Sequence, residues 1–299
     1  HLMPQLPGAT PTTDLKMMLK VFDDPNYRPD MIKVYPCTVV KTSELYDWLK
    51  RGEYKTYSDR SLINMLKKFK AKVPRYVRIS RLIRDIPGHH IQAGNTMTNL
   101  RQVIQEEMKK EGLKCNCLRC REVGHQHSES KVQNQKSKVK MFIDEYVASG
   151  GKEYFLSFED AKRDVVYAFC RLRVLNPVIL NAVKDPSRLD KRDSSSKPQN
   201  DNQGLPNEGI TPAVLDTMGY PAFIRELHTY GQLINIGKKS KGASQHSGMG
   251  RKLIAEAEKI CKKSGAYQLA VISGVGVREY YKKFGYKLEN TYMVKSLKK

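Results

Sequence analysis

Three cysteines, Cys115, Cys117 and Cys120, stand within six residues of one another. Thiolates at this spacing are typical ligands of zinc, which takes four donors in a tetrahedron and binds sulfur at about 2.3 Å. The candidates for the fourth ligand are, in order, Cys37, His125 and His127. Unliganded surface thiols are the simpler interpretation, but half of the chain's cysteines in one short segment favour a metal site in a reducing compartment.

A second pattern that could do chemistry is a glycine-containing loop before a helix. Its residues are Gln245, His246, Ser247, Gly248, Met249, Gly250 and Arg251. Glycines let the backbone approach a ligand closely, and unpaired N–H groups at the start of a helix attract a phosphate. Alone, this pattern is equally typical of an ordinary loop that caps a helix.

Two adjacent tyrosines follow this loop, within the segment AVISGVGVREYYKKFGY (270–286). Loop, strand and tyrosine motif in this order resemble the acyl-CoA-dependent N-acetyltransferase superfamily. The resemblance implies that the loop amides hold the diphosphate of coenzyme A. It also implies that Tyr281, with Tyr280 beside it, protonates the leaving thiolate, a suitable task for a phenol with a pKa of about 10. A packed aromatic is the alternative interpretation of Tyr281.

The strand expected over 224–236 precedes the loop, where the superfamily places residues that face its cofactor. Glu226, Leu227 and His228 are therefore candidates for acetyl-CoA contacts. Strand alternation puts Glu226 and His228 on the same face, where either could activate a water molecule. The alternative for Glu226 is a structural carboxylate paired with Arg225 or a lysine.

A broader resemblance covers nearly the whole chain except about 176–220. The segments that carry it are HLMPQLPG (1–8), KVYP (33–36), RDIP (84–87), RCREVG (119–124), FLSFED (155–160), RELHTYG (225–231) and AVISGVG (270–276). In this order they resemble the catalytic subunit of Elongator, and the cysteine cluster favours an archaeal or bacterial member.

This resemblance implies a radical SAM domain coupled to an acetyltransferase domain. The family uses acetyl-CoA and SAM to modify the wobble uridine, position 34, of tRNA at C5, which gives carboxymethyluridine. Its cluster-binding cysteines lie upstream of the segment present here. We therefore expect a fragment in which SAM and [4Fe–4S] belong to the full-length enzyme only, and which is inactive in the full reaction. Acetyl-CoA binding, thioester hydrolysis and tRNA binding are expected to remain.

The expected fold is α/β and α+β, in three parts. Residues 1–88 form the C-terminal part of a radical SAM partial TIM barrel, with Lys33 and Tyr35 at a strand end where barrel chemistry collects. Residues 89–150 form a basic zinc-binding linker. Residues 151–299 form a GNAT-like acetyltransferase domain with a mixed sheet, interrupted by a flexible insert at 176–220.

Local patterns predict the elements that position these residues. Apolar runs at 31–36 and 76–83 predict strands, and helical spacing predicts helices at 43–50, 58–71 and 98–111. Ser58 is a suitable N-cap for the second helix, and its apolar face is Leu62, Met65, Leu66 and Phe69. Strands that alternate with helices imply parallel βαβ units. Residues 152–175 predict a hairpin, and Cys170 and Cys261 fall on apolar faces.

The net charge of +22 favours a polyanionic partner. Basic residues concentrate in two groups: Lys67, Lys68, Lys70, Lys72, Arg75, Arg78, Arg81 and Arg84 with Tyr76, and Lys109, Lys110, Lys114, Arg119, Arg121, Lys131, Lys136, Lys138 and Lys140. We expect both groups to contact the anticodon region of tRNA in the cytoplasm, without a membrane, and leave a homodimer open. The rival functions are a protein lysine acetyltransferase and a non-catalytic tRNA-binding module.

Overall fold

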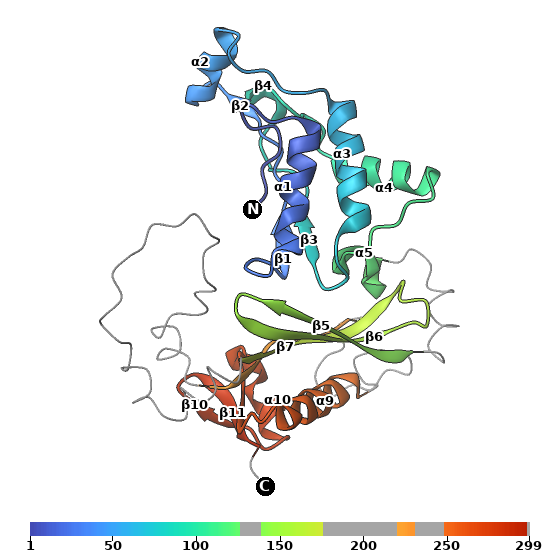
Figure 1. Ribbon diagram of the computed structural model, residues 1–299, viewed down its shortest axis with the longest axis vertical. Coiled ribbons are helices and arrows are strands. Elements are labelled where there is room, and N and C mark those ends of the chain that lie inside the picture. Colours follow the sequence, from blue (N-terminus) through green and yellow to red (C-terminus); the bar gives the residue numbers. More distant parts are fainter. Residues whose placement is uncertain (126–138, 176–219, 231–247, 298–299) are drawn as a thin grey trace, which may run out of the picture. The chain divides into compact units, whose positions relative to one another are not determined.

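The computed structural model describes residues 1–125, 139–175, 220–230 and 248–297. The chain forms two compact units, His1–His125 and Gln126–Lys299, which are described separately below (Figure 1). No helix in the described ranges is long and apolar enough to cross a membrane.

The first unit alternates short strands with helices. Its elements are α1 (Pro11–Asp23), β1 (Met31–Lys33), β2 (Val39–Val40), α2 (Glu44–Lys50), α3 (Asp59–Lys72), β3 (Arg78–Arg81), η1 (Gly88–His90), β4 (Ile91–Ala93), α4 (Leu100–Lys110), α5 (Leu118–Arg121) and η2 (Val123–His125). Helix α3 begins as predicted, because the Ser58 side chain accepts a hydrogen bond from the Ser61 amide. Its predicted apolar face is buried, and Figure 1 shows α3 packed beside α1.

Strands β1 and β3 pair in parallel, with Met31 opposite Arg78. Leu2 adds a further parallel bridge to Val34, directly after β1. These pairings confirm the predicted parallel βαβ arrangement, because helices α2 and α3 connect the two strands. Strands β2 and β4 form a separate antiparallel pair.

The second unit is built on a seven-stranded mixed sheet in the order β10-β11-β9-β8-β7-β6-β5. Its elements are β5 (Lys140–Ala148), β6 (Gly151–Glu159), β7 (Val166–Leu175), β8 (Ala222–Thr229), α9 (Met249–Lys263), β9 (Gln268–Val271), η6 (Val275–Val277), α10 (Arg278–Lys282), β10 (Lys287–Glu289) and β11 (Tyr292–Ser296). Neighbouring strands are antiparallel except for β8 and β9. The predicted hairpin is present as β6 and β7, and Cys170 and Cys261 are fully buried as expected.

The structure divides the chain at 125/126, within the segment that the sequence assigns to a linker at 89–150. Strand β5 pairs with β6 along its entire length, from Lys140 opposite Glu159 to Ala148 opposite Gly151. This stretch therefore belongs to the sheet of the second unit, whereas β4, α4 and α5 belong to the first.

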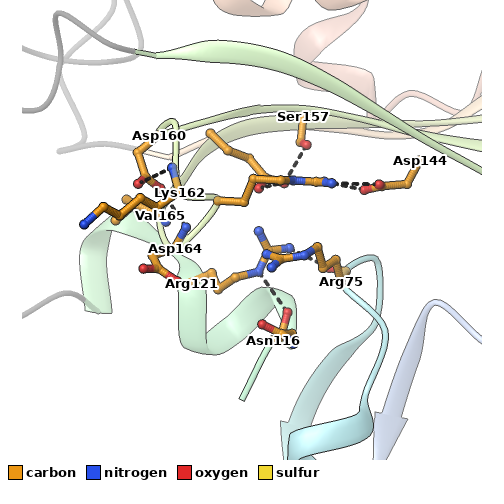
Figure 2. Close-up of polar contacts among 11 residues, drawn as sticks. Arg75, Asn116, Arg121, Asp144, Ser157, Asp160, Lys162, Asp164 and Val165 are labelled. Carbon is orange, nitrogen blue, oxygen red and sulfur yellow. Dashed lines mark hydrogen bonds and ion pairs between the residues drawn. The ribbon is translucent and has the colours of Figure 1, made fainter. Parts of the chain in front are cut away.

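A charged cluster fixes the β6–β7 turn. Arg163 donates two hydrogen bonds to Asp144 on β5, at 2.9 and 2.5 Å, and one at 2.9 Å to the buried Glu159 on β6. The Asp160 carboxylate accepts from the backbone amides of Lys162, Asp164 and Val165 (Figure 2). These contacts fix the geometry of the turn and give it a structural role.

Candidate functional sites

The three clustered cysteines come together as the sequence predicts. Their sulfur atoms all lie within 4.8 Å of one another, with Cys117 buried and Cys115 and Cys120 half-buried. The Cys120 amide donates to the Cys117 carbonyl at 3.1 Å, and Leu118 N–H donates to Val77 O at 2.8 Å, next to β3. Three convergent sulfurs form a donor set that suits zinc.

The Arg121 side chain fixes the loop that carries these cysteines. Its Nε donates to the carbonyl of Asn116, between Cys115 and Cys117, at 2.8 Å, and an Nη donates to the Arg75 carbonyl at 2.7 Å (Figure 2). One buried guanidinium thereby links the loop to the chain that leads into β3. Arg121 was predicted as a tRNA contact, but it is buried and acts within the fold.

Cys37, the first candidate for the fourth ligand, does not belong to this sulfur group. It is buried in the chain after β1, where its amide donates to the Pro4 carbonyl at 2.9 Å. Burial raises the pKa of its thiol, and a hydrogen bond with Tyr54 acts in the opposite direction. The side chain of His125 and the whole of His127 lie outside the described residues, so both stay predictions for the fourth ligand.

A buried lysine lies beside the cysteine cluster. Lys70, on α3, has a side chain with no exposed surface, and its Nζ donates to Cys120 Sγ at 3.8 Å. Gln105, on α4, donates to the same sulfur at 3.6 Å. Sequence reasoning missed the role of Lys70, although helical spacing from Leu62, Leu66 and Phe69 places it on the buried face of α3.

Two further residues of the predicted basic surface are buried. Lys67 is 4% exposed and lies 2.8 Å from Glu107 and 2.5 Å from Glu111, so it links α3 to the end of α4. The Tyr76 side chain is also buried. The prediction that Lys67, Lys70 and Tyr76 face a tRNA is therefore wrong, because side-chain packing removes them from solvent. The described lysines and arginines of these groups that remain exposed are Lys68, Lys72, Arg81, Arg84, Lys109, Lys110, Lys114 and Lys140.

Lys33 and Tyr35 lie at the C-terminal end of β1, as expected. Lys33 is the last residue of the strand, and its carbonyl accepts from the Leu2 amide at 2.9 Å. The Tyr35 ring packs edge-on against His1, with ring centroids 5.3 Å apart. Both side chains are half-buried, so each keeps access to solvent at a strand end.

In the second unit, α9 begins at the predicted glycine loop. Gly248 is its N-cap with φ +69°, a left-handed conformation that glycine adopts without strain, and this cap provides no side-chain hydrogen bond. The first amides of an α-helix have no partner within the helix, so those of Met249, Gly250 and Arg251 are the donors that this helix start can offer to a ligand. Gln245, His246 and Ser247 lie outside the described residues.

Strands β8 and β9 pair over only two positions and then part. The aligned pairs are Phe223 with Ala270 and Ile224 with Val271, and Ile272 N–H still donates to Ile224 O at 3.1 Å. Strand β8 continues to Thr229, past the end of this pairing. On its other side the register with β7 shifts at Arg225, since Arg171 is opposite Glu226 and Leu172 is opposite Ile224. Among the described residues the β8–β9 pairing therefore ends at Ile224 and Val271, and the Thr229 end of β8 lies close to the start of α9.

The two adjacent tyrosines have different surroundings. The Tyr280 hydroxyl lies close to Gly250. A Cβ added at Gly250 would be 2.7 Å from this hydroxyl oxygen and 3.7 Å from Thr229 Cγ2. Tyr280 is 36% exposed, whereas Tyr281 is 5% exposed and packs edge-on against Tyr286. Burial raises the pKa of both phenols. The hydroxyl at the start of α9 therefore belongs to Tyr280.

The predicted strand residues lie on β8. The Glu226 carboxylate pairs with the Nε of the buried Arg171 at 2.9 Å, while Arg225 pairs with Glu153 at 2.8 Å. His228 is exposed, and its ring lies 4.5 Å from that of Tyr230. Leu227 is half-buried opposite Cys170. The rest of the strand predicted to Ile236 lies outside the described residues.

Comparison with known proteins finds a family model that matches part of the first unit and relatives that match nearly the whole chain. A family model described as the radical SAM C-terminal domain matches residues 29–110. The chain is 39% identical over 299 residues to the tRNA uridine(34) acetyltransferase of Methanocaldococcus jannaschii, covering 99% of this chain and 49% of that protein. The corresponding protein of Dehalococcoides mccartyi is 38% identical, with coverage of 99% and 57%. Elongator complex protein 3 of Homo sapiens is 34% identical, with coverage of 100% and 48%.

A solved structure gives the same relationship. The structure of the archaeal Methanocaldococcus infernus Elp3 with an N-terminus deletion superposes on this chain with a TM-score of 0.77 and 36% sequence identity. The match covers 98% of this chain and 62% of the solved chain. The class defined by fold and sequence is a radical SAM C-terminal domain followed by a unit with a mixed sheet. The predicted relationship to the catalytic subunit of Elongator is confirmed over nearly the whole chain. The chain spans about half the length of the curated relatives.

Proposed function

We propose that this chain binds acetyl-CoA at the start of α9 and serves the C5 modification of the wobble uridine, position 34, of tRNA, to give carboxymethyluridine. The names of the relatives support the substrate and the reaction class. The observation that carries the acetyl-CoA site is the arrangement in the second unit, where the glycine-capped start of α9 lies beside the Tyr280 hydroxyl and Thr229 at the end of β8, past the point where β8 and β9 part.

The acetyl-CoA diphosphate would accept hydrogen bonds from the amides of Met249, Gly250 and Arg251, and the helix dipole would favour its negative charge. The pantetheine arm would run along β8, past the point where its pairing with β9 ends. Arg251 is exposed at the same end of α9 and adds a positive charge. This assignment keeps the predicted loop as the cofactor site, with Gln245, His246 and Ser247 as its remaining members.

In thioester hydrolysis, water adds to the acetyl carbonyl carbon and releases a proton to solvent, the C–S bond breaks, and the coenzyme sulfur gains a proton from an acid that solvent then reprotonates. We assign the proton donor to Tyr280, since its hydroxyl is at the helix start and Tyr281 is packed in the core. Burial raises the pKa of Tyr280, which keeps the phenol protonated at neutral pH. Glu226 remains the candidate to orient the water from β8, and its ion pair with Arg171 would hold the carboxylate in place.

Zinc would bind to Cys115, Cys117 and Cys120, and would stabilise the segment between α4 and η2. The fourth ligand is then a group other than Cys37 in its present position, or water. SAM and an iron–sulfur cluster would supply radical chemistry in the full-length protein, where Lys33 and Tyr35 border the strand ends that this chain contributes. The exposed lysines and arginines would contact tRNA phosphates in the cytoplasm.

Equilibrium binding and turnover test this proposal. Acetyl-CoA and desulfo-CoA are titrated calorimetrically into the 299-residue chain, and CoA release from acetyl-CoA is measured with and without tRNA. We expect both ligands to bind and tRNA to raise the rate of hydrolysis. Binding of tRNA without either ligand would instead support a non-catalytic tRNA-binding module, and acetyl transfer to peptides without tRNA dependence would support a lysine acetyltransferase.

A further inference from the structure

The side chain of Lys70 is the most unusual charged group in the first unit. It comes from the buried face of α3 and has no exposed surface. The partner recorded for its ammonium group is a sulfur atom, Cys120 Sγ, at 3.8 Å. By contrast Lys67, one turn earlier, is compensated by two carboxylates, Glu107 and Glu111.

An ammonium group in the protein interior is costly unless a negative charge compensates it. Among the described residues, the group at hydrogen-bond distance of this ammonium is Cys120 Sγ, which lies within 4.8 Å of the Cys115 and Cys117 sulfurs, so the cysteine cluster can supply that charge. Protonated thiols carry no charge. The position of Lys70 therefore makes physical sense when the cysteines are thiolates, the form in which they bind a metal.

A charge count gives the direction of the effect. Three neutral thiols have a net charge of zero, whereas three thiolates with one divalent cation have a net charge of −1 when the fourth ligand is neutral. Formation of the metal site from thiols thus adds one negative charge to a buried location. A fixed cation at hydrogen-bond distance stabilises the product of this reaction relative to its starting state.

Two other polar side chains surround the same cluster. Gln105 donates to Cys120 Sγ from α4 at 3.6 Å. Arg101 lies one helical turn before Gln105, and one of its terminal nitrogens donates to the Ile79 carbonyl at 3.0 Å. Its other terminal nitrogen is buried and has no hydrogen-bond partner within the part of the chain that the structure describes. The Arg101 guanidinium also interacts electrostatically with all three cysteines. The cluster is thus surrounded by donors and cations from α3 and α4.

We propose that Lys70 is a positioning residue of the three-cysteine metal site: its buried ammonium compensates the negative charge of the metal–thiolate group, and its N–H···S hydrogen bond, with that of Gln105, orients Cys120. This inference rests on the proposed metal site but concerns a residue outside the ligand set. Hydrogen bonds to ligands from outside the coordination sphere are typically worth 10- to 100-fold in metal affinity. Gln105 supplies a neutral donor and should contribute less.

The test compares Lys70→Met with Lys68→Met in the 299-residue chain. Methionine keeps the length and apolar volume of the lysine side chain but removes its charge and its donors. Lys68 is the exposed neighbour on the same helix and serves as the matched control. Zinc affinity is measured by competition with a chromophoric chelator, and the Co²⁺-loaded proteins are examined for the sulfur-to-cobalt charge-transfer band.

We expect Lys70→Met to weaken zinc binding 10- to 100-fold and to move the charge-transfer band to longer wavelength, because a thiolate that loses its N–H donor releases charge more easily. Lys68→Met should leave both unchanged. Lys70→Arg should retain most of the affinity, and Gln105→Met should weaken binding less than Lys70→Met. These two variants also test the inference if Lys70→Met does not fold.

Two results would overturn the inference at different levels. If the unchanged chain bound neither zinc nor cobalt, the metal site itself would be refuted, and the role of Lys70 with it. If the unchanged chain and Lys70→Met bound zinc within twofold of each other and had the same charge-transfer band, the metal site would stand and the role of Lys70 would be refuted.

Discussion

The contact between Gly250 and Tyr280 permits a quantitative prediction. A Cβ at position 250 would lie 2.7 Å from the Tyr280 hydroxyl, whereas ordinary contacts begin at 3.4 Å. In Gly250→Ala the hydroxyl must therefore retreat by about 0.7 Å, or the start of α9 must shift. The Tyr280 ring packs edge-on against Tyr281 and Phe284, at 5.4 and 5.0 Å, so it has little freedom to move elsewhere.

This substitution should separate activity from stability. A misplacement of about 1 Å in an active site can cost about 100-fold in rate, so we expect a 10- to 100-fold loss in acetyl-CoA hydrolysis. Alanine is the better helix former by up to about 1 kcal/mol. Gly250 has no left-handed backbone conformation, so this helix gain opposes the cost of displacing the Tyr280 hydroxyl, which is about 1–3 kcal/mol for an overpacked site. The protein should therefore stay folded with a free energy of unfolding lowered by at most about 3 kcal/mol, and its loss of activity is measured on the folded protein.

The assay is CoA release followed by chromatography, together with chemical denaturation. Gly88→Ala is the control. Gly88 is far from Gly250 in the sequence, and a Cβ added at Gly88 would meet no atom within 4 Å. In the double-mutant cycle with Tyr280→Phe, the two effects should be non-additive, since both substitutions disturb one hydroxyl. Full activity in a folded Gly250→Ala protein, or additive effects in the cycle, would refute the assignment of Tyr280 to the site.

Three further predictions follow from the described contacts. Burial raises the pKa of Tyr280 above the usual tyrosine value of about 10. The rate of hydrolysis should therefore show no decrease below about pH 10 that is due to loss of the phenol proton. A decrease near about pH 8 that is removed by Tyr280→Phe would contradict this. The ion pair with Lys67 lowers the pKa of Glu107, so its contribution to stability is present above about pH 4.3 and is lost as the pH falls through the lower folded-state value. Glu107→Gln should therefore reduce the acid-induced loss of unfolding free energy, and an unchanged acid limb in chemical denaturation would count against this pair. Cys117→Ser should abolish zinc binding, whereas Cys37→Ser should retain it because Cys37 is not among the clustered sulfurs; zinc analysis giving equal loss in both variants would restore Cys37 as the fourth ligand.

Local sequence patterns predicted the elements that depend on local physics. The Ser58 cap and the spacing of Leu62, Leu66 and Phe69 define α3, and the parallel pairing of β1 with β3 follows from the helices between them. The hairpin of β6 and β7 was predicted because strand and turn signals adjoin in sequence. Close spacing likewise sufficed to predict that Cys115, Cys117 and Cys120 meet.

Features that depend on packing between distant segments could not be predicted in the same way. The parting of β8 from β9 is set by pairing between residues such as Phe223 and Ala270, which are 47 positions apart in the sequence and leave no local signal. The sequence favoured Tyr281 over Tyr280 by motif position, while their burial depends on how α10 packs. Lys67 and Lys70 resemble surface lysines in a basic segment, and only the contacts with α4 and α5 distinguish them.

Amide hydrogen exchange of the 299-residue chain, with and without acetyl-CoA, tests the central claim most directly. We expect slower exchange on binding in two segments: the first turn of α9, at Met249–Arg251, and the part of β8 that continues past its pairing with β9, at 225–229. Slower exchange confined to other segments, or none at saturating acetyl-CoA, would contradict the claim that the start of α9 binds the coenzyme diphosphate.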